Sequence, residues 1–251
     1  MTTIAAYDPP SKMLFAMEGF RALHELAAYY LCAPIIQRVG GDGHAVLVLP
    51  GLLASDDSTK RLRRYLDSIG FDAHGWQQGR NYGLRPRVED RLIERIKKLR
   101  QTSGRSVSLV GWSLGGLYAR QLAKILPHDV RSVITLGSPF AGDPKSTNAW
   151  RIYEAFNGRN ESAVPHHAGS LAECPPVPTT AIFSRSDGVC AWEACRETPG
   201  PRAESIEVYG SHLGLGHNPA VLHAVADRLS QPEGDWRPFK RDGIRCVVYP
   251  S

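Results

Sequence analysis

Residues 111–116, Gly-Trp-Ser-Leu-Gly-Gly, decide how this chain folds, because they join two segments of different periodicity. Residues 107–110, just before them, form a short apolar run that is typical of a buried strand. Residues 114–126 carry apolar side chains at helical spacing and end before Pro127. The glycines allow the chain to turn sharply where a Cβ atom would clash. The sequence therefore predicts a tight strand–turn–helix connection with Ser113 at its tip.

A serine at the tip of such a turn is a candidate nucleophile. Gly111, Ser113 and Gly115 form the spacing G-x-S-x-G, which exposes a serine hydroxyl at the end of a strand. A free hydroxyl is a poor nucleophile, so it needs a base for its proton and donors for the developing oxyanion. The positive end of the following helix points at the same place. The alternative is a glycine-rich turn that serves packing alone.

Two polar loops further along the chain supply the partners that this serine needs. Asp187 follows the predicted strand 179–184, and His212 follows the predicted strand 204–209. Ligand sites of open parallel sheets lie at the carboxyl ends of the strands, so these loops should meet Ser113 there. We expect Ser113 to attack an acyl carbonyl, His212 to take its proton and Asp187 to orient the imidazole.

Each partner has a rival in the sequence. Asp143 follows the strand predicted at 132–136, but Asp187 is favoured because Asp-Gly just after a strand forms an exposed turn. His217 directly precedes Asn218-Pro219, a helix start whose dipole would oppose an imidazolium ion. His212, directly after its strand, fits the role better.

Backbone donors and an apolar pocket complete the expected site. The N–H groups of Leu114 and Leu52 are the candidate oxyanion donors; Leu52 lies in the loop after the strand 45–49. The side chains expected to line an acyl pocket are Leu53, Phe140, Trp150, Tyr153 and Phe156. The aromatic members of this set fit an ordinary core equally well.

With these residues in place, the chain resembles the α/β-hydrolase superfamily, within it the lipase and esterase branch. The resemblance covers roughly residues 44–230 and is strongest at 111–116, 183–189 and 210–215. It implies a Ser-Asp-His triad, a carboxylic-ester substrate and no cofactor. One departure is Pro50-Gly51, where such lipases often carry His-Gly before the oxyanion residue. A backbone donor at Leu52 is compatible with that change.

The order of elements predicts an α/β fold with a doubly wound, mostly parallel sheet. The expected strands are 45–49, 71–76, 107–110, 132–136, 179–184 and 204–209, and the expected helices are 57–69, 88–100, 114–126 and 219–229. We expect one domain over residues 1–251 with a small cap insertion at 140–177.

An N-terminal amphipathic helix is expected over residues 11–38. Its apolar face would contain Leu14, Met17, Phe20, Leu23 and Leu26, with Glu18, Arg21 and Glu25 elsewhere on the helix. That apolar face would either dock on the main domain or lie in a membrane interface.

Composition limits the function classes. The chain of 251 residues is 42% hydrophobic and 22% charged, typical of a globular protein. The net charge of +5 is scattered, which disfavours nucleic acid but allows weak attraction to anionic lipid. The five cysteines form neither a disulfide framework nor a zinc set, although Cys190 and Cys195 could be neighbours. The N-terminus has no signal-peptide pattern, so we expect a cytoplasmic protein. The cysteine pattern leads us to expect no metal site.

These observations predict a serine hydrolase that cleaves carboxylic esters of small molecules through an acyl-enzyme. Transfer of the same acyl group to an alcohol or amine would make the protein an acyltransferase instead. A hydrolase fold that only binds is the third hypothesis.

Overall fold

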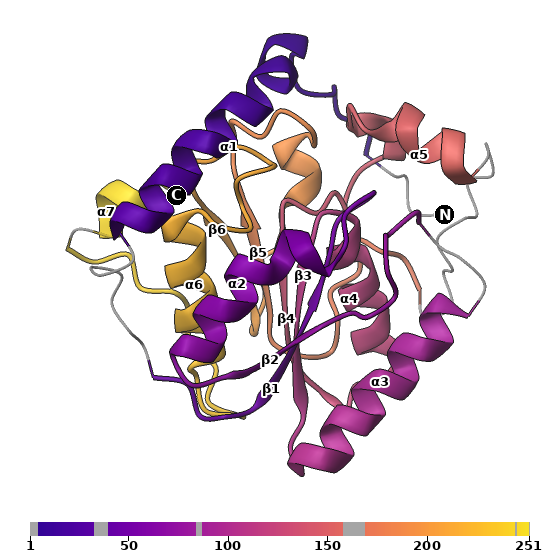
Figure 1. Cartoon of the computed structure of the whole chain (residues 1–251), viewed down its shortest axis with the longest axis vertical. Helices are drawn as coiled ribbons and strands as arrows, with labels where there is room; N and C mark the ends of the chain where they lie inside the picture. Colours follow the sequence, from indigo (N-terminus) through magenta and orange to yellow (C-terminus); the bar gives the residue numbers. More distant parts are fainter. Residues whose placement is uncertain (1–4, 33–39, 84–86, 158–168, 244, 251) are drawn as a thin grey trace.

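Six parallel strands form the centre of the protein (Figure 1). The computed structural model describes residues 5–32, 40–83, 87–157, 169–243 and 245–250. The strand order is β2-β1-β3-β4-β5-β6, and every neighbouring pair is parallel. The strands are β1 (Ala45–Leu49), β2 (Asp72–Gly75), β3 (Val107–Trp112), β4 (Val130–Leu136), β5 (Thr179–Phe183) and β6 (Ala203–Glu207). The predicted fold class and all six predicted strands are confirmed.

Helices cover both faces of this sheet, which is why its strands are apolar runs without alternation. On β1, Ala45, Leu47 and Leu49 pack in the cluster formed with α3 (Val88–Ser103) and α4 (Leu114–Ile125). Val46 and Val48 pack on the opposite face with α2 (Asp56–Ser68) and α6 (Pro219–Leu229). The strand order reverses between β1 and β3, so the carboxyl ends of these strands flank the switch point where such folds bind ligands.

Helix α1 (Lys12–Cys32) packs against α6, but not through its apolar face. Its inward side carries Glu18, which is buried, together with the partly buried Arg21 and Glu25. Many of its large apolar side chains are exposed: Met13, Phe15, Met17, Phe20, Leu23, Tyr30 and Leu31. The helix does dock on the main domain, but Met17, Phe20 and Leu23 of the expected apolar face stay exposed. Charged side chains of α1 bind backbone groups in two loops of the main domain instead. Residues 33–38 of the expected helix lie outside the described residues.

The region expected to form a cap contains two short helices. They are η1 (Pro144–Ser146) and α5 (Trp150–Asn157), and residues 158–168 of the region lie outside the described part of the chain. Arg120 of α4 fixes the segment that follows, donating to the carbonyls of Leu171 and Glu173 at 2.9 and 3.0 Å. Its guanidinium also pairs with Glu197, and both side chains are buried.

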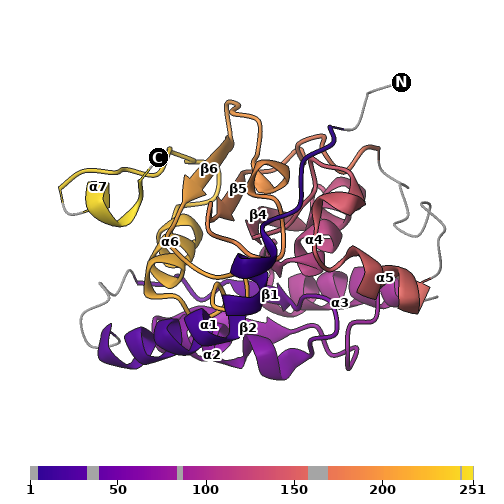
Figure 2. The same cartoon turned by 90° about the horizontal axis from the view of Figure 1, so that it is seen from above.

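The C-terminal tail returns to α6. After the short helix α7 (Arg245–Val248), the Tyr249 hydroxyl donates to Ala220 O at 2.9 Å. The Tyr249 ring contacts Phe239 edge to face, with ring centroids 4.7 Å apart. Figure 2 shows α7 and α1 on the same side of the molecule as α6. None of the helices in the described ranges is both long and apolar enough to cross a bilayer.

Candidate active site

Ser113 occupies the turn between β3 and α4, as the sequence predicts. Its backbone has φ 54° and ψ −122°, a conformation that L residues rarely adopt and that functional sites often hold under strain. The Ser113 N–H donates to Leu136 O at 2.8 Å, and the Ser113 carbonyl accepts from Gly116 N–H at 2.9 Å. A Cβ atom on Gly115 would lie 2.2 Å from Leu49 O, so the turn requires glycine there. Unlike its neighbours, Ser113 is partly exposed.

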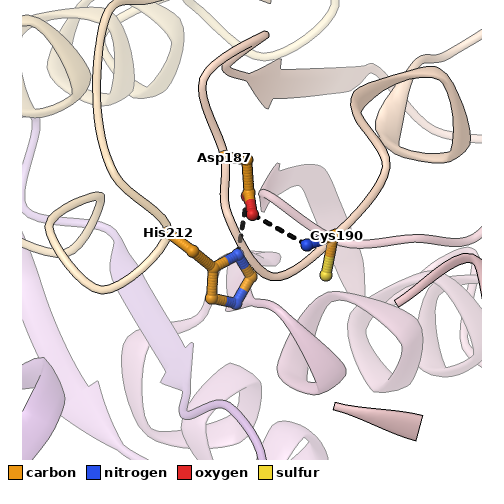
Figure 3. Close-up of side chains that lie close together, drawn as sticks. All are labelled: Asp187, Cys190 and His212. Carbon is orange, nitrogen blue, oxygen red and sulfur yellow. Dashed lines mark hydrogen bonds and ion pairs between the residues drawn. The ribbon is translucent and has the colours of Figure 1, made fainter. Parts of the chain in front are cut away.

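The loops after β5 and β6 bring Asp187 and His212 into direct contact. Asp187 Oδ2 lies 2.6 Å from His212 Nδ1, and both side chains are almost fully buried. Figure 3 shows the carboxylate and the ring pointing toward one another. The other carboxylate oxygen, Oδ1, accepts the N–H groups of Val189 and Cys190 at 2.8 Å each. These two donors fix the orientation of the carboxylate.

The backbone of His212 is fixed on both sides. Its carbonyl accepts from the indole Nε1 of Trp112 at 3.1 Å, which ties the histidine loop to the strand that carries the serine. Its N–H donates to Glu18 of α1 at 3.0 Å. Glu18 was missed by sequence reasoning, because the amphipathic pattern of its helix assigns charged residues to the solvent face.

Gly137, directly after β4, makes room for the carboxylate–imidazole pair. Its φ of 53° is one that glycine tolerates, and a Cβ there would lie 3.0 Å from Asp187 Oδ2 and 3.1 Å from His212 Nδ1. This glycine was not singled out by sequence reasoning. Its position, between the serine strand and the acid strand in the sheet, was the signal that could have identified it.

The surroundings of His212 favour its protonated form. Burial by itself would lower the pKa of His212, but the charge of Asp187 beside Nδ1 outweighs burial and raises the pKa well above its ordinary value. Cys190 stays protonated, since the thiol of Cys195 and burial raise its pKa. Cys190 and Cys195 are both free and buried.

Asp187, Cys190 and His212 also form a set of potential metal ligands within 4.8 Å of one another. A carboxylate, a thiol and an imidazole suit Zn²⁺, whose ligands lie roughly 3.3 Å apart in tetrahedral geometry. The 2.6 Å contact between Asp187 and His212 is shorter than that. The cluster as it stands is thus a hydrogen-bonded pair with a neighbouring thiol, and a metal would have to separate the pair.

Ser113 and the Asp187–His212 pair are linked through the elements between them. Ser113 N–H is bonded to Leu136 O, and the next residue, Gly137, borders the pair. Among the hydrogen bonds of the described residues, none joins the Ser113 hydroxyl to the His212 ring. Such bonds are often long in proteins without bound substrate and tighten when it binds.

The loop after β1 lies beside Ser113. A Cβ on Gly51 would be 3.2 Å from Ser113 Cβ and 3.8 Å from its Oγ. The N–H of Leu53 is engaged by Asn81 O at 2.6 Å, whereas no hydrogen bond within the described part of the chain uses the N–H of Leu52. Leu114 opens α4, where the helix leaves its first N–H groups unpaired. Both expected donors therefore belong to segments that border the serine.

The rival residues are engaged elsewhere. Asp143 accepts from Lys145 N–H at 2.7 Å and caps η1. A ring nitrogen of His217, Nε2, lies 3.0 Å from Ala22 O of α1.

The aromatic residues expected to line a pocket have different surroundings. Phe140 is buried, and the Arg120 guanidinium carbon lies 3.6 Å from the centroid of the Phe140 ring. Trp150 stacks on Tyr153 with centroids 5.8 Å apart, and Phe156 contacts Tyr82 at 5.4 Å. Phe156 is exposed, and Leu53 is partly exposed in the loop beside the serine.

A second Asp-His-Ser array lies at the other end of the strands. His44 Nδ1 is 2.5 Å from Asp42 Oδ1, and His44 Nε2 is 2.8 Å from Ser108 Oγ. His44 precedes β1 and Ser108 is near the start of β3, so the array is at the amino edge of the sheet. His44 and Ser108 are completely buried, and burial lowers the pKa of His44. Substrate has no access to this array, which serves packing.

The fold and this site place the chain in a known class of proteins. The model of the alpha/beta hydrolase family matches residues 22–249, nearly the whole chain, and the protein belongs to that family. A comparison with curated protein sequences finds no match.

Solved structures with lipase names share the fold at low sequence identity. Lipase B of Aspergillus fumigatus has a TM-score of 0.61 at 18% identity; the match covers 77% of this chain and 54% of the fungal one. The lipase BlEst2 of Bacillus licheniformis has a TM-score of 0.56 at 16% identity, covering 78% and 96%. The monoacylglycerol lipase of Paleococcus ferrophilus has 0.52 at 17%, covering 75% and 96%. The chain thus spans about half of the fungal lipase.

Proposed function

We propose that the protein is a serine hydrolase that cleaves small carboxylic esters through an acyl-enzyme. The observation that carries the proposal is the Asp187–His212 hydrogen bond of 2.6 Å at the same edge of the sheet as the strained, partly exposed Ser113. The names of the lipases that share the fold are consistent with an ester substrate.

In this mechanism His212 acts first as a base. Its Nδ1–H is held by Asp187, which leaves Nε2 unprotonated to accept the Ser113 proton as the hydroxyl attacks the acyl carbonyl. The imidazolium then donates its proton to the departing alcohol, and the acyl group remains on Ser113. Water repeats the two steps and releases the acid. Asp187 stays ionised throughout and stabilises the imidazolium.

The oxyanion of each tetrahedral intermediate is bound by the N–H groups of Leu52 and Leu114, which border Ser113 from opposite sides in the chain. One such donor typically contributes about 3 kcal/mol to transition-state stabilisation. In this proposal the acyl side is lined by Leu53 and by three aromatic side chains of α5, Trp150, Tyr153 and Phe156. Phe140 supports this segment from the core.

Covalent labelling of the intact protein tests the proposal. We expect a fluorophosphonate to add one phosphonyl group per chain, located by peptide mapping at Ser113, and p-nitrophenyl esters to protect against it. Turnover of these esters at increasing chain length would size the pocket, and added alcohol would reveal acyl transfer. Labelling at another serine, or none in a folded protein that also turns over no ester, would contradict the proposal.

The pH dependence of turnover follows from the environment of His212. Only the neutral imidazole can accept the Ser113 proton, and the charge of Asp187 outweighs burial and raises the imidazole pKa. Activity is therefore lost as pH falls through this raised pKa, and kcat/KM should rise to its plateau through a pKa above about 6.5. Initial rates with a neutral ester, followed at an isosbestic wavelength, measure this limb. An acidic limb with an apparent pKa below about 6.5 would mean that burial, which lowers the pKa of His212, outweighs the charge of Asp187, which raises it.

A further inference from the structure

Helix α1 contacts the two loops that carry Asp187 and His212 through charged side chains. Glu18 Oε1 accepts the N–H of Gly188 at 2.8 Å and that of His212 at 3.0 Å, and Oε2 accepts the N–H of Leu213 at 2.8 Å. One buried carboxylate therefore joins the acid loop to the histidine loop. Its three donors are the main-chain groups of His212 itself and of the residues next to Asp187 and His212.

Arg21 and Glu25 extend this contact along the same side of the helix. Arg21 donates to Ser186 O at 2.6 Å and to Gly210 O at 2.9 Å, again one acceptor in each loop. Glu25 accepts Ser211 N–H at 2.7 Å. Charged partners make these hydrogen bonds shorter and stronger than neutral ones.

The loops are shaped for the close approach of α1. A Cβ on Gly188 would lie 2.6 Å from the carbonyl carbon and oxygen of Leu14, so glycine there lets the helix backbone touch the acid loop. A Cβ on Gly214 would lie 2.1 Å from Glu25 Oε2. Glu18 and Arg21 precede the segment that matches the family model, which begins at residue 22.

We propose that Glu18 is a positioning residue that holds Asp187 and His212 in hydrogen-bonding register. It reaches neither the imidazole ring nor the reacting serine in any described contact, so it acts through the main chain of the two loops. The Nδ1–Oδ2 distance of 2.6 Å depends on how these two loops sit relative to one another. Because catalysis by the pair rests on the proposed ester hydrolysis, the role of Glu18 in turnover rests on it too.

Kinetics of Glu18→Gln test this role in the full chain. The amide oxygen of the glutamine can keep the N–H groups of Gly188 and His212, but its N–H₂ group then faces the N–H of Leu213, which repels it and displaces the histidine loop. We expect kcat to fall about 10- to 100-fold, because small displacements of catalytic groups have effects of this size, with KM changed less than about twofold. Glu18→Asp keeps the charge but is one methylene shorter, and it should show a smaller loss of kcat.

Glu204→Gln is the matched control. Like Glu18, Glu204 accepts a backbone N–H, that of Phe239 at 2.8 Å, and it pairs with Arg228. It is only partly buried, and none of its described hydrogen bonds or ion pairs reaches either catalytic loop. If the loss of kcat in Glu18→Gln came only from removing a structural carboxylate, Glu204→Gln would lose kcat as well. The proposal expects Glu204→Gln to keep the wild-type kcat.

A readout without substrate separates this inference from the proposed function. The His212 Nδ1 proton in its short bond to Asp187 should give a strongly downfield proton resonance. We expect it to shift or broaden in Glu18→Gln and, to a lesser extent, in Glu18→Asp, but not in Glu204→Gln. If wild-type protein turns over no ester, this resonance alone decides the role of Glu18. An unshifted resonance in folded Glu18→Asp and Glu18→Gln, with wild-type kcat where turnover exists, would overturn the proposal.

Discussion

Replacing Ser113 with alanine should lower kcat for ester hydrolysis by about 10⁶-fold, the loss found when a serine nucleophile is removed from a hydrolase. In the proposed mechanism the Ser113 hydroxyl forms the acyl-enzyme. The Cys190 thiol also lies beside His212, but it is buried and its pKa is raised, so it does not replace the serine. The strained backbone of Ser113 is better suited to a small side chain, so folding should be preserved. Burst kinetics and fluorophosphonate labelling of the purified variant measure the loss.

Ser108→Ala is the control that the fold itself provides. Ser108 also hydrogen-bonds a histidine that is held by an aspartate, but at the buried amino edge of the sheet. We expect turnover within about twofold of wild type and a stability loss of about 1–3 kcal/mol, because His44 loses a buried partner. Equal loss of turnover in the two variants would mean that activity reports fold integrity rather than the nucleophile.

The contrast between these two serines explains how much the sequence could predict. The strand–turn–helix connection at Ser113 could be predicted because glycines around the serine indicate a sharp turn, and the strand and helix on either side have clear periodicities. The contact between Asp187 and His212 could be predicted because each residue follows a predicted strand, and the carboxyl ends of parallel strands meet at one edge. The Asp42–His44–Ser108 array was not found. Its residues come together through strand register, which local patterns do not encode.

Helix α1 shows where pattern reasoning fails. Its apolar stripe was expected either to dock on the main domain or to lie in a membrane interface. The structure docks Glu18, Arg21 and Glu25 instead, since the loops after β5 and β6 present N–H and carbonyl groups that need partners. Those groups exist only once the sheet has assembled, so no window of sequence contains the signal.

Replacing Asp187 with asparagine should lower kcat by about 10⁴-fold while leaving the fold intact, the size of effect seen when a triad carboxylate becomes an amide. The N–H groups of Val189 and Cys190 donate to Oδ1, so they will hold the amide oxygen of the asparagine in that position. The amide nitrogen must then face His212 Nδ1. Because the amide nitrogen can only donate, Nδ1 of His212 has to accept, and the ring proton moves to Nε2. A proton on Nε2 blocks proton transfer from Ser113. Steady-state kinetics of the variant measure the loss.

Asp143→Asn is the matched control for this prediction, because Asp143 is the other carboxylate that follows a strand near the site. Its carboxylate caps η1, a role that an asparagine side chain also fills, so we expect wild-type kcat. If Asp143→Asn lost activity and Asp187→Asn did not, the acid of the mechanism would be wrong. If Asp187→Asn lost only about tenfold, the tautomer argument would fail, and the carboxylate would contribute mainly its charge.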